Sequence, residues 1–299
     1  MDEIFHVSFP GLGIESITIS RVAFRLFGVD VYWYGILIAL AVILGLLLAY
    51  RSAPRFGIKS DTILDTVIAV VPLMIVFARL YYVVFAQDEF KGNWLSIFNL
   101  RTGGLGFYGG VIGGIFAVIL VSRIRHVPVS RMMDLLVVYL PLGQAIGRWG
   151  NFFNQEAFGS NTTLPWGMIS EGTTRYLTEI GGFDPSMPVH PTFLYEFIGN
   201  MLIFALLYYV HAKSRRPFET LCVYLISYGF IRFFVENLRT DSLYIGNTDI
   251  RISVVMSGAM VICGGAAWIL IRRKPIVEGR AGLVALEKKE KDLAENPGE

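Results

Sequence analysis

The segment 147–159 reads GRWGNFFNQEAFG and crowds polar side chains at the end of an otherwise hydrocarbon-like stretch. The run before it, 132–147, is long enough to enter a bilayer, so Arg148 is expected at membrane depth or at its edge. An ionisable side chain there is costly and usually has a partner and often a function. A guanidinium offers a fork of donors that matches phosphate oxygens. The segment therefore suggests anion binding, and phospholipid head groups are the commonest anions at that depth.

The polar residues of this segment, Arg148, Asn151, Asn154, Gln155 and Glu156, exceed what helix packing requires. Arg148, Asn151 and Gln155 would share one face if the helix continued through them. Other chemically capable residues lie near the ends of the remaining apolar stretches: Tyr34, Arg79, Tyr108, His190, Tyr195, Glu196, Arg232, Glu236 and Arg239. The spacing of Arg232, Glu236 and Arg239 at i, i+4 and i+7 predicts one stripe of a helix.

The amino-acid composition indicates the class of protein that carries these residues. Of the 299 residues, 54% are hydrophobic and only 17% are charged, which is typical of a multi-span membrane protein and too apolar for a soluble globule. We expect one integral-membrane domain over residues 1–276 and no cleaved signal peptide. The two cysteines, Cys222 and Cys263, fall in apolar runs and are expected to be small buried hydrophobes.

Seven apolar stretches are long enough to span a bilayer, and they predict an all-α polytopic membrane protein. They lie near residues 32–50, 62–86, 107–122, 132–149, 192–211, 218–236 and 252–271. Several contain glycine or proline, which membrane helices tolerate when neighbouring groups satisfy the backbone.

Basic residues predict the orientation of these spans. Lysine and arginine triplets follow spans one, three, five and seven, whereas the loop after span two carries only Lys91 and Arg101. The positive-inside rule then places the N-terminus outside and the C-terminus in the cytoplasm. The connection 151–189 is predicted to form a small extracytoplasmic cap, and residues 277–299 a solvated cytoplasmic tail.

With this orientation, the unusual polar residues all fall in the outer half of the membrane, which suggests a single site. Simpler explanations stay open for several of them. Gly106, Gly110 and Gly114 would form a small-residue packing face. Residues 32–34 would form an interfacial aromatic belt, and His190 would only precede a helix start. Arg232 and Glu236 would form a structural intramembrane pair.

The sequence contains no HExxH, GxSxG or P-loop motif and no cysteine–histidine cluster. Zinc proteolysis, serine hydrolysis through a nucleophile elbow and nucleotide-driven transport therefore lack support. What remains is a set of carboxylates, guanidiniums and phenols that opens toward the outer leaflet. Such a set favours an enzyme that acts on an anionic lipid.

At these residues the sequence resembles the bacterial prolipoprotein diacylglyceryl transferases. The resemblance rests on five motifs that occur in the expected order and cover nearly the whole chain: WYG (33–35), GGLGFYGG (103–110), GRWGNFFNQEAFG (147–159), HPTFLYE (190–196) and VENLRTD (235–241). It implies a seven-span enzyme of the bacterial inner membrane. That enzyme would move the diacylglyceryl group of phosphatidylglycerol to the lipobox cysteine of a prolipoprotein signal peptide and release glycerol phosphate.

The resemblance also assigns roles to residues. Tyr108, Arg148, Arg239, Glu156 and Tyr34 are expected to be catalytic. Phosphatidylglycerol is expected to bind at Arg148, Asn151, Arg239, Glu236, Arg79 and His190. No metal, cofactor, nucleotide or nucleic acid is expected, and the enzyme would work as a monomer among membrane lipids.

Three positions depart from the family pattern. Tyr108 stands where the family commonly has histidine, a natural proton acceptor near neutral pH, whereas an ordinary phenol with a pKa of about 10 is a poor base. Phe193 replaces the usual glutamine, and Ser253 to Met256 replaces a Ser-x-x-Gln arrangement. If Tyr108 is not the base, Glu156, Glu196 and His190 are the candidates. A divergent paralogue with another substrate or low activity is one alternative.

Two other protein classes share the seven-span pattern. A transporter or channel would need polar residues near the midplane, whereas here they are expected farther out, and no inverted repeat is evident. A seven-span receptor is the second class, but span seven has no lysine that could bind retinal.

Overall fold

The computed structural model describes residues 4–91, 94–99, 103–245 and 248–273. Seven of its helices are long and apolar enough to cross a membrane, which confirms the predicted number of spans. They are α1 (Trp33–Ser52), α2 (Ser60–Phe85), α3 (Phe107–Ile124), α4 (Val129–Asn154), α6 (Thr192–Lys213), α7 (Glu219–Leu238) and α8 (Ile252–Arg272). The expected tail, 277–299, lies outside the described residues.

The chain divides into two compact units, each of which is described by itself. Of the described residues, the first unit comprises 4–45, 137–213, 219–245 and 248–273, and the second comprises 46–91, 94–99, 103–136 and 214–218. Short 3-10 helices occur at Pro10–Leu12, Ala53–Phe56, Gln87–Phe90 and Trp94–Phe98.

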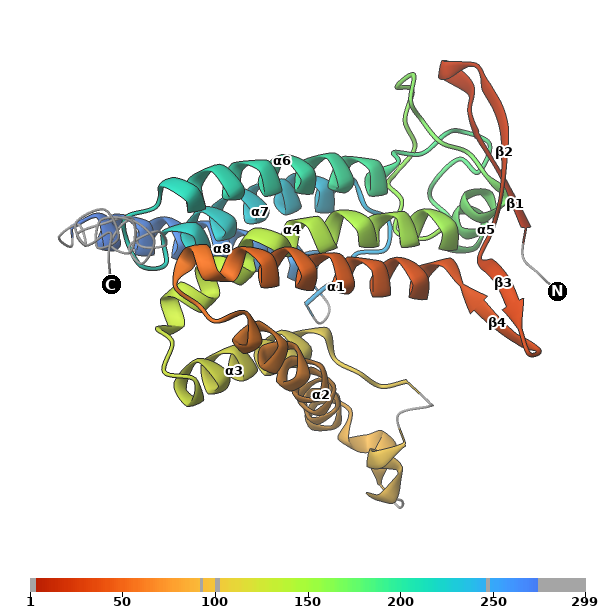
Figure 1. Cartoon of the computed structure of the whole chain (residues 1–299). Helices are drawn as coiled ribbons and strands as arrows, with labels where there is room; N and C mark the ends of the chain where they lie inside the picture. Colours follow the sequence, from red (N-terminus) through yellow and green to blue (C-terminus); the bar gives the residue numbers. More distant parts are fainter. Residues whose placement is uncertain (1–3, 92–93, 100–102, 246–247, 274–299) are drawn as a thin grey trace, which may run out of the picture. The chain divides into compact units, whose positions relative to one another are not determined.

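In the first unit, α7 packs against both α6 and α8 (Figure 1). Glycine permits the close approach of α7 and α8. A Cβ at Gly229 would lie 2.8 Å from the Ser257 carbonyl oxygen, and one at Gly264 would lie 2.9 Å from the Leu225 side chain. Small residues at helix contacts are the usual means by which membrane helices gain packing energy.

Beyond the ends of α4, α6 and α7, the first unit has a layer of strands and one short helix (Figure 1). Strands β1 (Ile4–Phe9) and β2 (Ile14–Ser20) form one antiparallel hairpin, and β3 (Val22–Leu26) and β4 (Val29–Tyr32) form another. Helix α5 (Glu171–Ile180) begins at a capping box made by Ser170 and Thr173. The hairpins were not foreseen, although apolar and polar residues alternate over 5–9, which is a strand signal.

Aromatic and aliphatic side chains join this layer to the helices. Ser8 and Ile169 exchange backbone hydrogen bonds of 2.9 and 3.0 Å, which attaches β1 to the chain before α5. Phe5 and Val7 of β1 are buried with Phe152 of α4, Leu177 of α5 and Phe193 of α6. The segment 151–189, expected to form the cap, thus shares a core with the N-terminal strands. Its location outside the membrane stays a prediction.

In the second unit, α2 and α3 pack side by side (Figure 1). A Cβ at Gly109 would lie 2.4 Å from the Phe77 carbonyl oxygen, and one at Gly113 would lie 2.5 Å from that of Leu73. A Cβ at Gly110 or Gly114 would lie 3.9 or 3.5 Å from its nearest neighbouring atom, which is an ordinary contact distance. The predicted packing face of Gly106, Gly110 and Gly114 was therefore wrong in register. The close contact with α2 is made instead by Gly106, Gly109 and Gly113. Residues at i, i+3 and i+7 also lie on one side of a helix.

Candidate active site

The carboxylate of Glu196 is the centre of a buried ionic network in the first unit. Its side chain, in the first turns of α6, is only 3% exposed. Arg148 of α4 approaches its Oε2 to 2.6 Å, and Arg232 of α7 donates to its Oε1 at 2.7 Å. Arg239, which follows α7, lies 3.6 Å from the same Oε1. One carboxylate thus gathers three guanidiniums from three segments of the chain.

Glu236 supplies a second buried carboxylate to this network. Its side chain is 1% exposed and pairs with Arg232, one turn earlier on α7, as the sequence spacing predicted. Arg251, the residue before α8, donates to the Glu236 backbone carbonyl. The Tyr228 hydroxyl accepts a hydrogen bond from Arg148. Buried charges are tolerated only when they are paired and hydrogen-bonded, and the alternation of acid and base meets that condition.

A second branch of the network runs from Arg148 toward the end of α4. The Arg148 guanidinium donates to Asn151 Oδ1 at 3.3 Å, and Asn151 Nδ2 donates to Glu156 Oε1 at 2.9 Å. The helix ends at Asn154, so Gln155 does not share the face of Arg148. Gln155 instead has a φ of 53°, and its buried side chain accepts a hydrogen bond from Ser170.

Arg239 is held on its other side by Asp241. Its Nε and Nη2 donate to the two carboxylate oxygens at 2.9 and 2.7 Å, a bidentate pair. Burial by itself would lower the pKa of Arg239, but the carboxylates of Asp241, Glu196 and Glu236 together raise this pKa above its ordinary value. Because α7 ends at Leu238, Arg239 lies just past the helix, and the stripe predicted for Arg232, Glu236 and Arg239 holds only for the first two.

Gly159 links the His190 and Arg239 segments of the chain through backbone contacts. Gly159 donates to the His190 carbonyl at 2.9 Å and forms a β-bridge with Arg239, and a Cβ at Gly159 would lie 2.7 Å from that of His190. The His190 Nδ1 lies 3.1 Å from the Tyr195 hydroxyl, which also accepts a hydrogen bond from Trp166. Burial lowers the pKa of His190 below its ordinary value, so the imidazole is neutral at pH 7.

Tyr34 lies against the same end of α4. A Cβ at Gly150 would lie 2.5 Å from the Tyr34 ring, so only glycine admits the ring there. The adjacent Trp33 stacks on Phe153 with the ring centroids 5.0 Å apart. These two contacts fix the start of α1 beside the helix that carries Arg148 and Asn151.

Arg79 and Tyr108 belong to the second unit. The Arg79 guanidinium donates to the backbone carbonyls of Ser96, Ile97, Asn99, Gly103 and Gly104 at 2.7 to 3.1 Å. The five bonds occupy all five N–H donors of the guanidinium. Arg79 therefore has a structural role in holding these backbone segments. Tyr108, in the first turn of α3, packs its ring against those of Tyr81 and Phe107.

The structure adds residues that were not among the proposed site residues. Glu196 was considered only as an alternative base and Arg232 only as half of an ion pair, yet both are central to the network. Their signals were the motif HPTFLYE and the i, i+4 spacing. Tyr228 and Arg251 carried no sequence signal, because an isolated tyrosine in an apolar span and a basic residue in a loop are both common.

The network offers several guanidiniums whose positions are fixed by buried carboxylates. Such preorganised cations can bind a phosphate ester and stabilise negative charge that develops on its oxygens. Within the described ranges, no group of three or more histidine, cysteine, aspartate or glutamate side chains could hold a metal ion.

Similarity to known proteins covers this network and most of the chain. A family model of prolipoprotein diacylglyceryl transferase matches residues 21–270. The chain is 45% identical to a phosphatidylglycerol-prolipoprotein diacylglyceryl transferase of Finegoldia magna, over 82% of this chain and 93% of the relative. It is 42% identical to the proteins of the same name from Clostridioides difficile, over 85% and 96% of the two chains, and Bacillus cereus, over 86% and 93%. The chain therefore belongs to the prolipoprotein diacylglyceryl transferase family.

Proposed function

We propose that this protein transfers the diacylglyceryl group of phosphatidylglycerol to the lipobox cysteine of prolipoproteins, the first step of lipoprotein maturation. Family membership supports the reaction, since the relatives carry that name over nearly their whole length. The structural observation that carries the proposal is the group of three guanidiniums around Glu196, because this reaction releases a phosphate ester.

The reaction requires one bond to form and one to break. The cysteine thiol loses its proton to a base, and the sulfur attacks the glycerol carbon that carries the phosphate ester. A carbon–sulfur bond forms, and the carbon–oxygen bond breaks with its electron pair moving to the phosphate oxygen. Glycerol phosphate leaves. Since negative charge grows on this oxygen, fixed guanidiniums lower the barrier more than they stabilise the bound substrate.

Residue roles follow from position and from the family motifs. Arg148 and Arg239 would hold the phosphate, Asn151 and Glu156 would orient Arg148, and Glu236 would hold Arg232. Tyr34 and His190 would shape the site on either side. Tyr108 remains the proposed proton acceptor from its motif alone. Arg79 would contribute indirectly, by fixing residues 96–99 and 103–104, which precede Tyr108.

We further propose that the protein resides in the bacterial inner membrane with this network in the outer half. The positive-inside pattern supports that orientation. Prolipoprotein signal peptides would then present their lipobox cysteine at the same depth as the phosphatidylglycerol head groups.

Incubation of the purified protein with phosphatidylglycerol and a lipobox peptide tests the proposal. The peptide should gain the mass of a diacylglyceryl group, with one glycerol phosphate released per peptide. Arg148→Ala should lower the rate by about 10²-fold or more, as expected for loss of a preorganised donor. It should still fold, because Glu196 keeps Arg232. Arg148→Lys keeps the charge without the fork and should be intermediate.

Two outcomes would contradict the proposal. A parent protein that binds phosphatidylglycerol and leaves the peptide unmodified would favour a divergent paralogue. Solute flux into liposomes without peptide lipidation would favour a transporter.

A further inference from the structure

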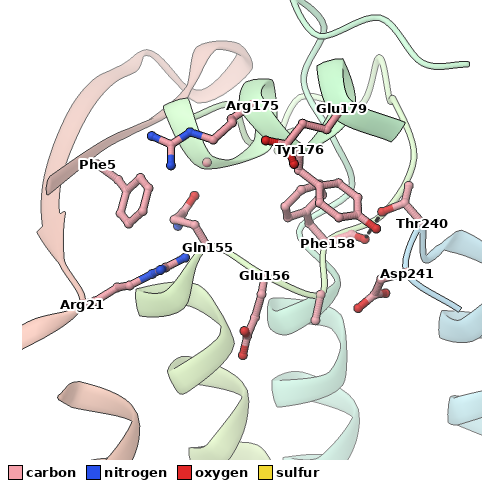
Figure 2. A pocket seen from close by; sticks show the side chains of 12 residues that line it. Phe5, Arg21, Gln155, Glu156, Phe158, Arg175, Tyr176, Glu179, Thr240 and Asp241 are labelled. Atoms are coloured by element: carbon pink, nitrogen blue, oxygen red, sulfur yellow. Dashed lines mark hydrogen bonds between the residues drawn. The ribbon is translucent and has the colours of Figure 1, made fainter. Parts of the chain in front are cut away.

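A cavity of about 230 Å³ lies in the first unit between β1, the end of α4, α5 and the chain after α7. Figure 2 shows the guanidiniums of Arg21 and Arg175 on the left side of this cavity, and Tyr176, Thr240 and Asp241 on the right. Glu156 lies between them at the lower edge. One side of the cavity thus carries two guanidiniums. Hydroxyl oxygens and the carboxylates of Glu156, Glu179 and Asp241 line the rest.

The cationic side is built from two separate elements. Arg21 follows β2, and its guanidinium is fixed by two hydrogen bonds to the Asn154 carbonyl, at 2.8 and 3.2 Å. Arg175 projects from α5. Two guanidiniums on one wall are suited to a phosphate, whose oxygens accept bonds from both.

The opposite side suits hydroxyl groups. The Thr240 hydroxyl donates to the Phe158 carbonyl and bonds the Tyr176 hydroxyl. The Asp241 and Glu156 carboxylates can only accept hydrogen bonds when ionised, so they match the hydroxyl donors of a diol. A ligand with a phosphate at one end and free hydroxyls at the other would satisfy both walls.

Two cavity residues are also the outer partners of the arginine network. Asp241 holds Arg239 through a bidentate pair, and Glu156 holds Asn151, which in turn contacts Arg148. A small anion that leaves Arg148 and Arg239 therefore has this cavity next to it.

We propose that this cavity binds a phosphoglycerol group, the part of phosphatidylglycerol that becomes glycerol phosphate in the reaction. The inference rests on the proposed function. It adds a second binding site, formed by Arg21 and Arg175, to the arginine network. The group is held here either as the head group of the intact lipid or as the released product.

Size favours this ligand over a peptide. Pockets for drug-sized ligands are roughly 300 to 1,000 Å³, and the present cavity is smaller. Glycerol phosphate has about ten heavy atoms, which fits a pocket below that range. An extended peptide of several residues would need a longer groove.

The test variant is Arg175→Gln, since this exposed arginine lies outside the arginine network. Arg25→Gln is the matched control, because Arg25 is an exposed arginine of the same unit that pairs with Asp30 on the β3–β4 hairpin. Equilibrium dialysis of radiolabelled glycerol phosphate against the full-length protein in nanodiscs gives Kd without requiring turnover. Lipidation of the peptide gives KM for phosphatidylglycerol and for the peptide.

We expect Arg175→Gln to raise the Kd for glycerol phosphate by roughly 10-fold, the effect of losing one charge-assisted hydrogen bond. Arg175→Lys should raise it less, and Arg25→Gln should leave it unchanged. A raised KM for phosphatidylglycerol with unchanged product binding would also support the proposal and would identify the lipid head group as the occupant.

Unchanged values for both ligands in Arg175→Gln would overturn the proposal. A change in KM for the peptide alone would also overturn it and would make the cavity a peptide site. Because dialysis needs no turnover, a parent protein that binds glycerol phosphate and fails to lipidate the peptide would contradict the proposed function and leave the cavity assignment standing.

Discussion

At the scale of single residues, Glu196 explains how three guanidiniums can share a buried site. Like charges repel strongly where water is scarce, and the buried carboxylate between them offsets that repulsion. The same contacts fix the guanidiniums in place, since Arg148 and Arg232 each approach a different oxygen of Glu196. A fixed cation stabilises a phosphate leaving group better than a mobile one, because no reorganisation is needed during the reaction.

Glu196→Ala should therefore destabilise the protein and abolish transfer together. Removing one partner of a buried ion pair typically costs about 3–5 kcal/mol. Thermal unfolding in detergent and the rate of peptide lipidation measure the two effects. Glu171→Gln is the control, since Glu171 is half-exposed and pairs with His6 at the surface; it should change neither quantity appreciably. An unaltered midpoint of unfolding in Glu196→Ala would show that the network does not hold these helices.

Substitutions of Tyr108 test whether its side chain accepts the proton of the cysteine thiol. If its side chain accepts the thiol proton, Tyr108→Phe should lose most of the activity. Tyr108→His should then keep or raise it near neutral pH, because an imidazole is deprotonated as pH rises through about 6.5, whereas a phenol needs a pH near 10.

The pH–rate profiles of the parent and both variants distinguish these roles. A profile for Tyr108→Phe that matches the parent would exclude proton transfer by Tyr108 and direct attention to Glu156, Glu196 or His190. Activity that appears only in Tyr108→His would mark the parent as a paralogue that has kept the lipid site.

At the scale of elements, the side chains of the arginine network come from the ends of helices and not from their middles. The end of α4 provides Arg148 and Asn151, the start of α6 provides Glu196, and the end of α7 provides Arg232 and Glu236. The turn at Gln155, buried against Ser170, ends α4 and directs the chain into the layer with α5. Glu156, the residue after this turn, accepts the hydrogen bond from Asn151.

The α2–α3 contact offers a sharp test of helix packing. Gly109→Ala should destabilise the protein by about 1–3 kcal/mol, because the added Cβ would overlap the Phe77 carbonyl. Gly110→Ala, one residue along the same helix, is the matched control. Its Cβ would meet nothing closer than 3.9 Å, and alanine favours the helix, so stability should hold or rise slightly. Equal unfolding midpoints for the two variants would contradict the packing register.

At the scale of the whole molecule, seven apolar helices and the distribution of basic residues predict one orientation. A reporter fused after Arg216, between α6 and α7, should behave as cytoplasmic. A reporter inserted near Thr173, in α5, should behave as extracytoplasmic. Fusions after Arg125 and Arg273 serve as independent controls for the cytoplasmic side. The reverse pattern would place the arginine network in the leaflet that faces the cytoplasm, where a translocated lipobox could not reach it.

Much of this molecule could be predicted from the sequence. The seven spans follow from the length of the apolar runs, because a bilayer of fixed thickness demands about 20 apolar residues. The clustering of partner side chains around Arg148 follows from the cost of burying an unpaired charge. The pairing of Arg232 with Glu236 follows from helix geometry alone, since residues four apart are neighbours on any helix.

Only the tertiary structure decided which charges meet across helices. Nothing in the sequence places Glu196 between Arg148, Arg232 and Arg239, because that depends on how α4, α6 and α7 are rotated about their axes. The commitment of Arg79 to backbone carbonyls, the glycine register of α3 and the N-terminal hairpins were likewise missed. Apolar periodicity shows that a helix spans the membrane, whereas side-chain pairing arises from packing between segments far apart in the chain.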